Sequence, residues 1–401
     1  MSKVKILTGN QAAAEAVKLC RVQVVSAYPI TPSTSLTEYL ADWIERGELK
    51  AEYVRVESEH SVMTVCVSAS TVGARVFTST SSHGLLYMHE QLHWAAGSRL
   101  PIVTCVINRG VGAPWSIFND QQDSIAQRDT GWIQIYCRDN QEIIDTVIQA
   151  YRIAETAYCP VMVCYDGFVL SHTMMPVEIP EADKVNGFLP PYKPHTILSQ
   201  EAPRNINPVI FPNQRRDAEG ILRDGYMEFR WKLQHALEGA RDVIVDVNRA
   251  FADAFGRDHG GMLWSHKLED AEVCIVGMGS IASEATTAAD MLREQGIRAG
   301  VVGIRAYRPF PRDEIRAALK NAPAIVIFEK DISYGYEGAL CADVKAALYG
   351  TGASAPVHNY VAGLGGRDVK SAELADAVRS SLADMAGGVR ERQTWLNCVT
   401  E

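Results

Sequence analysis

Strand-like apolar runs alternate with helix-like amphipathic segments from residue 8 to about residue 175. β-Branched and apolar runs predict strands over about 22–28, 53–56, 75–78, 101–108, 132–136 and 161–165. The segments between them have helical spacing, over about 10–20, 34–46, 59–71, 84–97 and 140–157. Asn10 is the expected cap of the first helix, and a long loop is expected over 109–130. This alternation favours an α/β fold with a parallel sheet and right-handed crossovers.

The pattern changes after residue 175. Eight of the 17 prolines lie between residues 176 and 215, which predicts an extended connector. An apolar stripe with a period of three or four residues then predicts one long amphipathic helix that includes Tyr226 and Phe255. From about residue 270, strand patterns return and predict a second α/β unit. We therefore divide the chain into 1–180, 181–220, 221–268 and 269–401.

Composition narrows the possible partners. Among 401 residues, 47% are hydrophobic and 22% charged, and the formal net charge is -9. This acidic balance argues against nucleic acid or an anionic membrane as the main partner. No apolar stretch approaches the length of a membrane span, and the first residues lack the apolar core of a secretion signal, so we expect a cytoplasmic protein.

The nine cysteines show no metal-binding spacing. No pair is spaced as C-x-x-C, and no cysteine–histidine group has zinc spacing. Most of them lie in apolar strand or helix patterns, where a cysteine is typically a small buried hydrophobe. We therefore predict no metal site in this chain, and any iron–sulfur cluster must be held by another chain.

The turn Tyr28-Pro29-Ile30-Thr31-Pro32-Ser33 is the most informative motif. It follows a predicted strand directly and precedes a helix. Each proline fixes φ, so Thr31 between them has a nearly predetermined direction. In open α/β sheets, ligands bind at the carboxyl ends of the strands, where this turn lies. A rigid strand-to-helix connection explains the motif by itself equally well.

Three other features lie at the same predicted edge of the sheet. Glu59 begins an otherwise apolar helix, where an acid also serves simply as a favourable N-terminal charge. The run Thr78–Gly84 ends a strand with hydroxyl groups, which suit either a polar ligand or a cap and turn. Arg109 follows a buried strand, where a guanidinium suits a bound carboxylate or a surface ion pair. Gly277-x-Gly279 is a weak fragment of a dinucleotide turn.

Taken together, the motifs resemble the alpha subunits of the 2-oxoacid:ferredoxin oxidoreductases, the pyruvate synthase family. The resemblance rests on their order along almost the whole chain, at residues 27–33, 58–59, 80–85, 108–109, 116–123, 128–132, 166–168, 308–311 and 363–368. It implies a parallel-sheet domain of the thiamine diphosphate (ThDP) binding type, the half that holds the aminopyrimidine. A second α/β domain, similar to the transketolase C-terminal domain, is implied to follow.

The resemblance also implies an activity and partners. Such enzymes use ThDP to decarboxylate a 2-oxo acid, pass two electrons through iron–sulfur clusters and join the acyl group to coenzyme A (CoA). The ThDP diphosphate and Mg²⁺ are implied to lie on a beta subunit, and this chain has no G-D-G motif followed by N-N. The 4Fe-4S clusters are implied on ferredoxin-like gamma and delta subunits, with a flavin subunit if NAD is the acceptor. The chain is then inert alone.

Residue by residue, the resemblance assigns three catalytic positions. Glu59 matches the glutamate that hydrogen-bonds the aminopyrimidine ring of ThDP, Thr31 the substrate threonine, and Arg109 the arginine that pairs with the substrate carboxylate. The remaining pocket residues are implied to be Tyr28, Pro29, Ser82 and His83. Family members often carry glutamine where His83 stands, so His83 is either a proton donor or a neutral hydrogen-bonding group.

One departure bears on the substrate. Many pyruvate enzymes of the family follow the arginine with alanine, leucine and serine, whereas Gly110-Val111-Gly112 follow Arg109 here. Two glycines remove side-chain volume and loosen the loop, which predicts a larger or more mobile pocket. Such a pocket suits a bulky 2-oxo acid: an aromatic acid such as phenylglyoxylate, or a branched-chain or indolyl acid. By family frequency, pyruvate stays the best single candidate, narrowly ahead of a bulkier acid. Three other classes stay open: a non-catalytic assembly subunit, a transketolase-like enzyme without electron transfer, and a nucleotide-binding electron-transfer module built on Gly277-x-Gly279.

Overall fold

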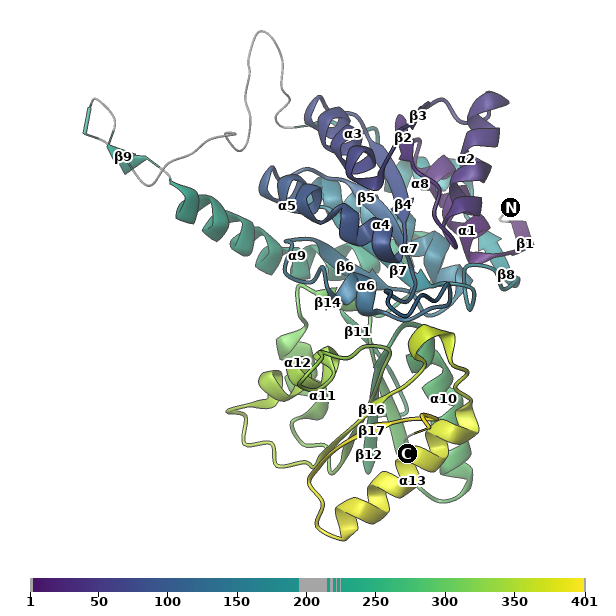
Figure 1. Ribbon diagram of the computed structural model, residues 1–401, viewed down its shortest axis with the longest axis vertical. Coiled ribbons are helices and arrows are strands. Elements are labelled where there is room, and N and C mark those ends of the chain that lie inside the picture. The colour runs from purple at the N-terminus through teal and green to yellow at the C-terminus, as the bar shows by residue number, and fades with distance from the viewer. Residues whose placement is uncertain (1–2, 195–214, 217–218, 221, 224, 400–401) are drawn as a thin grey trace.

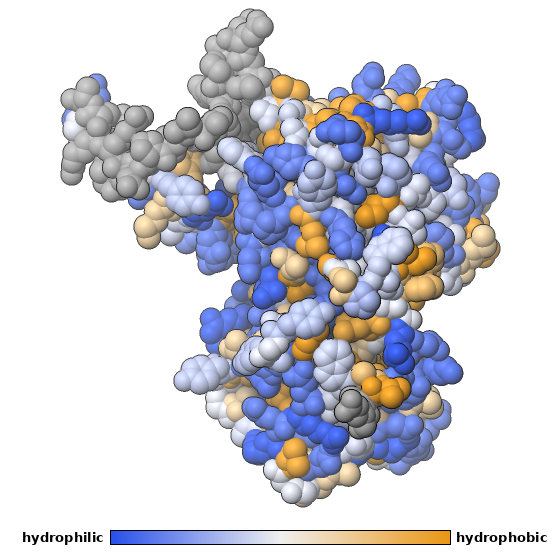
Figure 2. Space-filling model, viewed as in Figure 1, coloured by the Kyte–Doolittle hydropathy of each residue, from blue (hydrophilic) through white to orange (hydrophobic). Residues whose placement is uncertain are grey.

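Two sheets form two lobes in the computed structural model, which describes residues 3–194, 215–216, 219–220, 222–223 and 225–399 (Figure 1). Figure 2 shows the two lobes and the narrower waist between them. Of the connector predicted over 181–220, residues 195–214 and 217–218 lie outside the described residues. In the described part, Ala182–Phe188 form a helix, so the prediction of an extended segment is wrong there. The parallel-sheet architecture predicted for both parts of the chain is confirmed.

The first sheet has the strand order β14–β6–β7–β5–β4–β2–β3. Its strands are β2 (Val24–Ala27), β3 (Glu52–Arg55), β4 (Val76–Thr80), β5 (Val103–Asn108), β6 (Ile133–Tyr136), β7 (Val161–Asp166) and β14 (Ala306–Arg308). All of these run parallel except β14, which pairs antiparallel with β6. An antiparallel ribbon of β1 (Lys3–Leu7) and β8 (Met175–Ile179) lies beside the sheet.

Helices cover both faces of the first sheet. One face packs against α1 (Gly9–Leu19), α2 (Thr34–Glu45), α7 (Asn140–Ala157), α8 (Ala182–Phe188) and α9 (Tyr226–Phe255). The other face packs against α3 (Glu59–Thr71), α4 (Ser82–Tyr87) and α5 (His89–Gly97). Val103 and Ile107 of β5 face the first layer, whereas Val106 faces the second. This confirms that β5 is buried on both faces.

The second sheet has the strand order β11–β13–β12–β15–β16–β17. Its strands are β11 (Leu263–His266), β12 (Val273–Met278), β13 (Ala299–Ile304), β15 (Ile325–Glu329), β16 (Val357–Val361) and β17 (Glu391–Trp395). Its helices are α10 (Gly279–Glu294), α11 (Arg312–Leu319), α12 (Ala339–Leu348) and α13 (Ser371–Ala386), with a 3₁₀ turn over Leu364–Gly366. A short pair, β9 (Arg215–Arg216) with β10 (Leu222–Arg223), precedes α9.

One apolar core continues from the first lobe into the second. Met63, Leu85 and Tyr136 belong to the same buried cluster as Val276 and Tyr307. The rings of Tyr136 and Tyr307 meet edge to face, with their centroids 6.2 Å apart. Because β14 also joins the first sheet, the second lobe is attached to the first through both backbone pairing and apolar packing.

Several sequence-based details are wrong. Thr8, not Asn10, caps α1, because the Thr8 hydroxyl accepts from the Gln11 amide while the Gln11 side chain returns to the Thr8 N–H. The helix expected over 84–97 is divided at Met88 into α4 and α5. The loop expected over 109–130 contains α6 (Gln122–Ile125).

The cysteine prediction is confirmed at every position but one. Eight of the nine cysteines are buried thiols, whereas Cys398 is exposed. In the described part of the chain, no cluster of histidine, cysteine and acidic side chains is grouped to hold a metal ion. A search of the described helices finds none with the length and apolar character needed to cross a membrane.

Candidate active site

The predicted site residues follow four neighbouring strands at the same edge of the first sheet. Thr31 follows β2, Glu59 follows β3, Ser82 and His83 follow β4, and Arg109 follows β5. These strands are parallel, so their carboxyl ends meet at one edge. The fold therefore brings together side chains that are up to 78 positions apart along the chain, as in the hydrogen bond between Arg109 and Thr31.

Asn10 anchors the proline-flanked turn. Its amide donates to the Pro32 carbonyl at 2.8 Å and to the Ser35 hydroxyl at 2.8 Å, while its oxygen accepts from the Tyr165 hydroxyl at 2.8 Å. Asn10 is fully buried, so these bonds are shielded from water. Sequence reasoning missed this role, because the residue lies two positions after the helix cap and its partners belong to other elements.

The Glu59 side chain is buried beside Gly84. Ser58 caps α3 by accepting from the Ser61 amide at 3.3 Å, which places Glu59 at the first helical position with 8% of its surface exposed. A Cβ on Gly84 would lie 2.6 Å from Glu59 Oε1 and 2.5 Å from Thr80 Oγ1. Only glycine therefore lets α4 approach the carboxylate this closely.

Unused hydrogen-bonding groups lie near this carboxylate. In the described part of the chain, the buried hydroxyls of Thr80 and Ser81 have no hydrogen-bond partner. No described donor forms a hydrogen bond with the Glu59 carboxylate either. Buried polar groups normally find partners, so these unpaired groups fit a polar ligand that enters the site.

Arg109 is a buried cation held by backbone carbonyls. Its Nη1 donates to Thr31 O at 2.8 Å and its Nε donates to Ser116 O at 3.0 Å. Only 3% of the residue is exposed, and the Trp115 ring centroid lies 5.3 Å from the guanidinium carbon. Burial lowers the pKa of Arg109, and the nearby Asp123 carboxylate opposes that shift without forming an ion pair with the guanidinium. The site therefore offers an oriented positive charge to an anionic group.

Asp123 connects the two loops that follow β4 and β5. Its Oδ2 accepts from the Ser82 amide at 2.9 Å and from the Arg109 amide at 3.0 Å. Its Oδ1 accepts from Asn108 Nδ2 at 2.7 Å and from the Ser124 amide at 2.8 Å. Burial raises the pKa of the Asp123 carboxyl to about 6, and the four donors oppose that shift. Asp123 lies in the motif at residues 116–123, but the sequence alone predicted no role for it.

His83 supports the loop after Arg109. His83 Nε2 accepts from the Gly112 amide at 3.1 Å, so the neutral ring carries its proton on Nδ1, 3.3 Å from Ser82 Oγ. Ser82 Oγ in turn donates to the Gly110 carbonyl at 2.6 Å. Both ring nitrogens are therefore engaged in holding this loop, which favours the neutral hydrogen-bonding role over that of a proton donor.

The two glycines of this loop pack closely against neighbouring side chains, Gly112 against His83 and Gly110 against Asp120. A Cβ on Gly112 would lie 3.2 Å from His83 Nε2, and one on Gly110 would lie 3.1 Å from Asp120 Oδ2. These missing side chains would point at neighbouring protein groups. This geometry favours close loop packing, rather than a wider pocket, as the reason for both glycines.

The second lobe holds the far end of this loop. The Gly365 amide donates to Asp120 Oδ2 at 3.2 Å, and the Gly366 amide donates to Asn119 O at 2.7 Å. Burial raises the pKa of the Asp120 carboxyl to about 7, and the nearby Asp123 carboxyl adds to the shift. The glycine-rich turn near the end of the chain thus serves as a clamp on the loop.

A buried ion pair joins the lobes beside the clamp. Lys330 Nζ lies 3.0 Å from Asp166 Oδ2, and Ser280 Oγ hydrogen-bonds the same carboxylate. Gly279 has a φ of 62° and lies against Gln121, where a Cβ would be 3.1 Å from Nε2. The Gly277-x-Gly279 turn therefore contacts the loop of the first lobe, and its contacts give no support to a dinucleotide site.

Family models match both parts of the chain. Residues 15–252 match the model described as pyruvate flavodoxin/ferredoxin oxidoreductase, thiamine diphosphate-binding. Residues 271–374 match the model of pyruvate:ferredoxin oxidoreductase core domain II.

Known proteins agree with these matches. The chain is 47% identical to pyruvate synthase subunit PorA of Methanocaldococcus jannaschii, over 92% of each chain. It is 45% identical to ketoisovalerate oxidoreductase subunit VorA of Pyrococcus abyssi, over 91% of this chain and 90% of that one. The fold also resembles the solved 2-oxoglutarate:ferredoxin oxidoreductase of Magnetococcus marinus, with a TM-score of 0.71 at 19% identity, over 94% of this chain and 65% of that chain. The chain therefore belongs to the alpha subunits of the 2-oxoacid:ferredoxin oxidoreductase family.

Proposed function

We propose that this chain is the alpha subunit of an enzyme that oxidatively decarboxylates a small aliphatic 2-oxo acid and transfers the acyl group to CoA. The relatives named above are a pyruvate synthase subunit and a ketoisovalerate oxidoreductase subunit. The observation that carries the proposal is that two buried groups lie at the same edge of the sheet: the Arg109 guanidinium, which forms no ion pair with a described carboxylate, and the Glu59 carboxylate. The names of these relatives give no support to phenylglyoxylate as the substrate.

Arg109 and Thr31 are the proposed substrate-binding residues. The guanidinium is oriented by the carbonyls of Thr31 and Ser116, so it can present a fixed face to the carboxylate of a 2-oxo acid. Desolvation makes the attraction to an anion stronger than it would be in water. The Thr31 side chain is exposed next to this contact, where it can hydrogen-bond the substrate.

Glu59 is the proposed anchor of the ThDP aminopyrimidine, and Tyr28, Pro29, Ser82 and His83 are proposed to line the cofactor site. The buried carboxylate and the unpaired hydroxyls of Thr80 and Ser81 fit a heterocycle with several hydrogen-bonding nitrogens. When bound, ThDP supplies the electron sink that decarboxylation of a 2-oxo acid requires. The chain's own contribution is to orient this ring and to hold the substrate carboxylate.

A second chain is proposed to complete the site. Tyr28, Pro29, Thr31, His83 and Trp115 are all exposed on the isolated chain, so the substrate contacts lie on an open surface. Decarboxylation through ThDP needs a site that excludes water. A beta subunit that carries the diphosphate and Mg²⁺ contacts would cover this face, and the 4Fe-4S clusters would lie on gamma and delta subunits, with a flavin subunit if NAD is the acceptor.

The non-catalytic and the transketolase-like classes have less support. A non-catalytic assembly subunit gives no reason to keep the Glu59 carboxylate buried without a described hydrogen-bond donor, or the Arg109 guanidinium buried without an ion pair among the described residues. A transketolase-like enzyme would share the fold, since a split-gene transketolase gives a TM-score of 0.52 at 17% identity, but this likeness extends to the fold alone.

The test is a dye-reduction assay on the complex purified with its co-expressed partner subunits. CoA-dependent reduction of a viologen dye is measured with pyruvate, ketoisovalerate and phenylglyoxylate as substrates. We expect a higher kcat/KM with pyruvate or ketoisovalerate, and its loss in the Glu59→Gln complex, which should still assemble. A preference for phenylglyoxylate would contradict the proposed substrate class, and unchanged activity of Glu59→Gln would contradict the cofactor role.

A further inference from the structure

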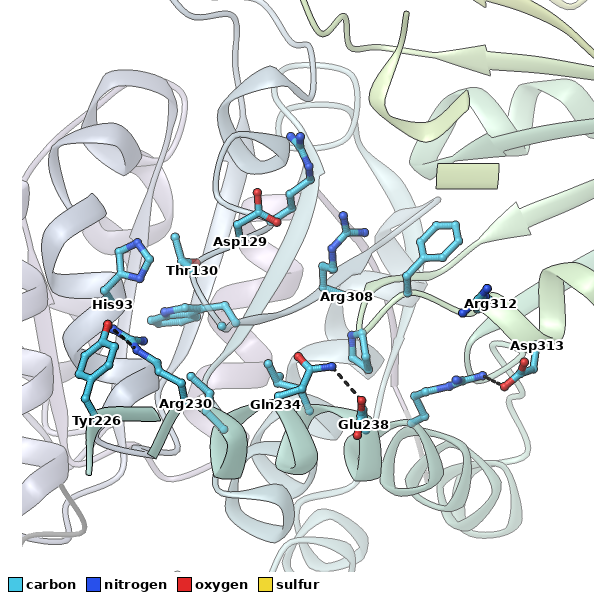
Figure 3. Close-up of a pocket in the computed structure, with 18 of the residues that line it drawn as sticks. His93, Asp129, Thr130, Tyr226, Arg230, Gln234, Glu238, Arg308, Arg312 and Asp313 are labelled. Atoms are coloured by element: carbon cyan, nitrogen blue, oxygen red, sulfur yellow. Dashed lines mark hydrogen bonds and ion pairs between the residues drawn. The ribbon is translucent and has the colours of Figure 1, made fainter. Parts of the chain in front are cut away.

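A long groove lies outside the candidate active site, along the N-terminal half of α9. Figure 3 shows α9 on one side, with Tyr226, Arg230, Gln234 and Glu238, and the segments that carry Thr130, Arg308 and Arg312 facing it. The groove encloses about 890 Å³. Because a helix rises about 1.5 Å per residue, the stretch from Tyr226 to Arg241 makes the groove roughly 22 Å long.

The groove is positively charged on an acidic chain. Its lining includes six arginines and three acidic residues, whereas the whole chain has a net charge of -9. The arginines are Arg128, Arg230, Arg241, Arg308, Arg312 and Arg316. Such a concentration of one sign produces a local field that favours an acidic partner.

Internal ion pairs use only part of this positive charge. Arg241 lies 3.2 Å from Asp313 and 2.6 Å from Glu314, and Arg308 lies 2.9 Å from Asp343. Among the described residues, neither Arg230 nor Arg312 forms an ion pair, and Arg230 donates to the Tyr226 hydroxyl at 2.9 Å through its Nε alone. These guanidinium groups are therefore available to a carboxylate from outside.

The lining gives little support for a small ligand. The Thr130 hydroxyl donates to Gln127 O at 2.7 Å and the Trp132 indole donates to Leu92 O at 2.9 Å, so both polar groups are already used. Among the described residues, none of the buried polar side-chain atoms without a partner belongs to this lining. The groove presents positively charged guanidinium groups beside the apolar side chains of Leu233 and Phe310. An amphipathic peptide can contact both kinds of surface at once.

The same half of α9 exposes further apolar surface. Met227 is 80% exposed and Trp231 is 57% exposed. Figure 1 shows this half of the helix projecting beyond the body of the upper lobe. A helix end whose outer face exposes aromatic and apolar side chains is stabilised when another chain packs against it.

We propose that the groove binds an acidic amphipathic segment of a partner subunit. This inference rests on the proposed function in one respect, namely that the enzyme is an assembly of several subunits. Carboxylates of the segment pair with Arg230 and Arg312, and its apolar side chains pack against Leu233 and Phe310.

Charge reversal tests the electrostatic part of this inference. The variant combines Arg230→Glu with Arg312→Glu, two exposed positions of the groove, in the purified multisubunit complex. The matched control combines Arg249→Glu with Arg298→Glu, two exposed arginines outside the groove, so that variant and control change the net charge equally. Native mass spectrometry over a salt series should show about tenfold weaker subunit association for the double variant and a change below about twofold for the control. Equal association of variant and control would overturn the inference.

Photo-crosslinking identifies the occupant. Benzoylphenylalanine placed at Gln234 in the complex should form an adduct with an acidic segment of a partner subunit, whereas the same probe at exposed Asp246 should not. The inference is overturned if the adduct joins Gln234 to a second copy of this chain, to residues 195–224 of the same chain, or to nothing. Circular dichroism of each variant confirms that it is folded.

The two proposals fail in different ways. If the wild-type complex oxidises 2-oxo acids but gives no adduct at Gln234, the groove inference is wrong and the proposed function stands. If the adduct forms but no CoA-dependent oxidation is found, the proposed function is wrong and the docking groove stands.

Discussion

Replacing Asp123 by asparagine should loosen the two loops that carry Ser82 and Arg109. The carboxylate accepts from four donors, two on each oxygen: Asn108 Nδ2 and the Ser124 amide on Oδ1, and the Ser82 and Arg109 amides on Oδ2. An asparagine side chain presents one oxygen and one NH₂ group. Whichever way the amide is oriented, two buried donors then face another donor.

The cost follows from this count of donors. A buried donor that loses its acceptor costs about 1–3 kcal/mol, so two of them cost about 2–6 kcal/mol. A loss of 2 kcal/mol corresponds to about a thirtyfold change in a local opening equilibrium. The comparison is made at pH 8, because burial raises the pKa of the Asp123 carboxyl to about 6 and the wild-type group is then ionised.

Hydrogen exchange measured by mass spectrometry on the assembled complex gives the readout. Peptides that contain Ser82 or Arg109 should exchange at least about thirtyfold faster in the Asp123→Asn variant. Asp183→Asn is the control, because this exposed acid of α8 lies outside both loops and outside the groove beside α9, and its loss should change exchange by less than about twofold. Unchanged exchange at both loops would refute the role of Asp123, as would equal acceleration across the whole chain, which indicates general destabilisation.

Three further predictions concern the site and its support. Gly84→Ala should lower kcat/KM about a hundredfold without dissociating the complex, because the new Cβ would lie 2.6 Å from Glu59 Oε1 and displace that carboxylate; steady-state kinetics and native mass spectrometry check this. Arg109→Lys should raise KM for the 2-oxo acid about tenfold or more, because an ammonium cannot keep both carbonyl contacts and still present a fixed face, and an unchanged KM would remove Arg109 from the site. Burial raises the pKa of Glu329 from 4.5 to about 8, so between these pH values unfolding releases its proton and the free energy of unfolding falls as pH rises. Glu329→Gln should reduce this fall by up to about 1.4 kcal/mol per pH unit, as measured by urea unfolding from pH 5 to 8.

Sequence signals such as caps and apolar spacing predict a helix or strand correctly where the residues of that element alone determine where it begins and ends. The helix expected over 59–71 is α3, because Ser58 caps it and the following residues are apolar. The start of α1 was predicted wrongly for a local reason too: Asn10 is a good cap by type, but its amide serves Pro32 and Ser35, and Thr8 takes the cap. Side-chain chemistry therefore indicates what a residue can do, whereas the tertiary partners determine which of those contacts it makes.

Residues that connect distant segments could not be identified in this way. Asp120 is one acid among 48 acidic residues, and what distinguishes it is the Gly365 amide 245 positions further along the chain. Gly366 lies so close to the same loop that a Cβ would come within 2.3 Å of Phe118 Cβ, at a φ of 76° that favours glycine in any case. Both contacts come from the second lobe and act on the loop that begins at Arg109. The second lobe therefore shapes the loop that follows Arg109, the proposed substrate-binding residue, and a role limited to assembly does not explain why two of its glycines are packed against that loop.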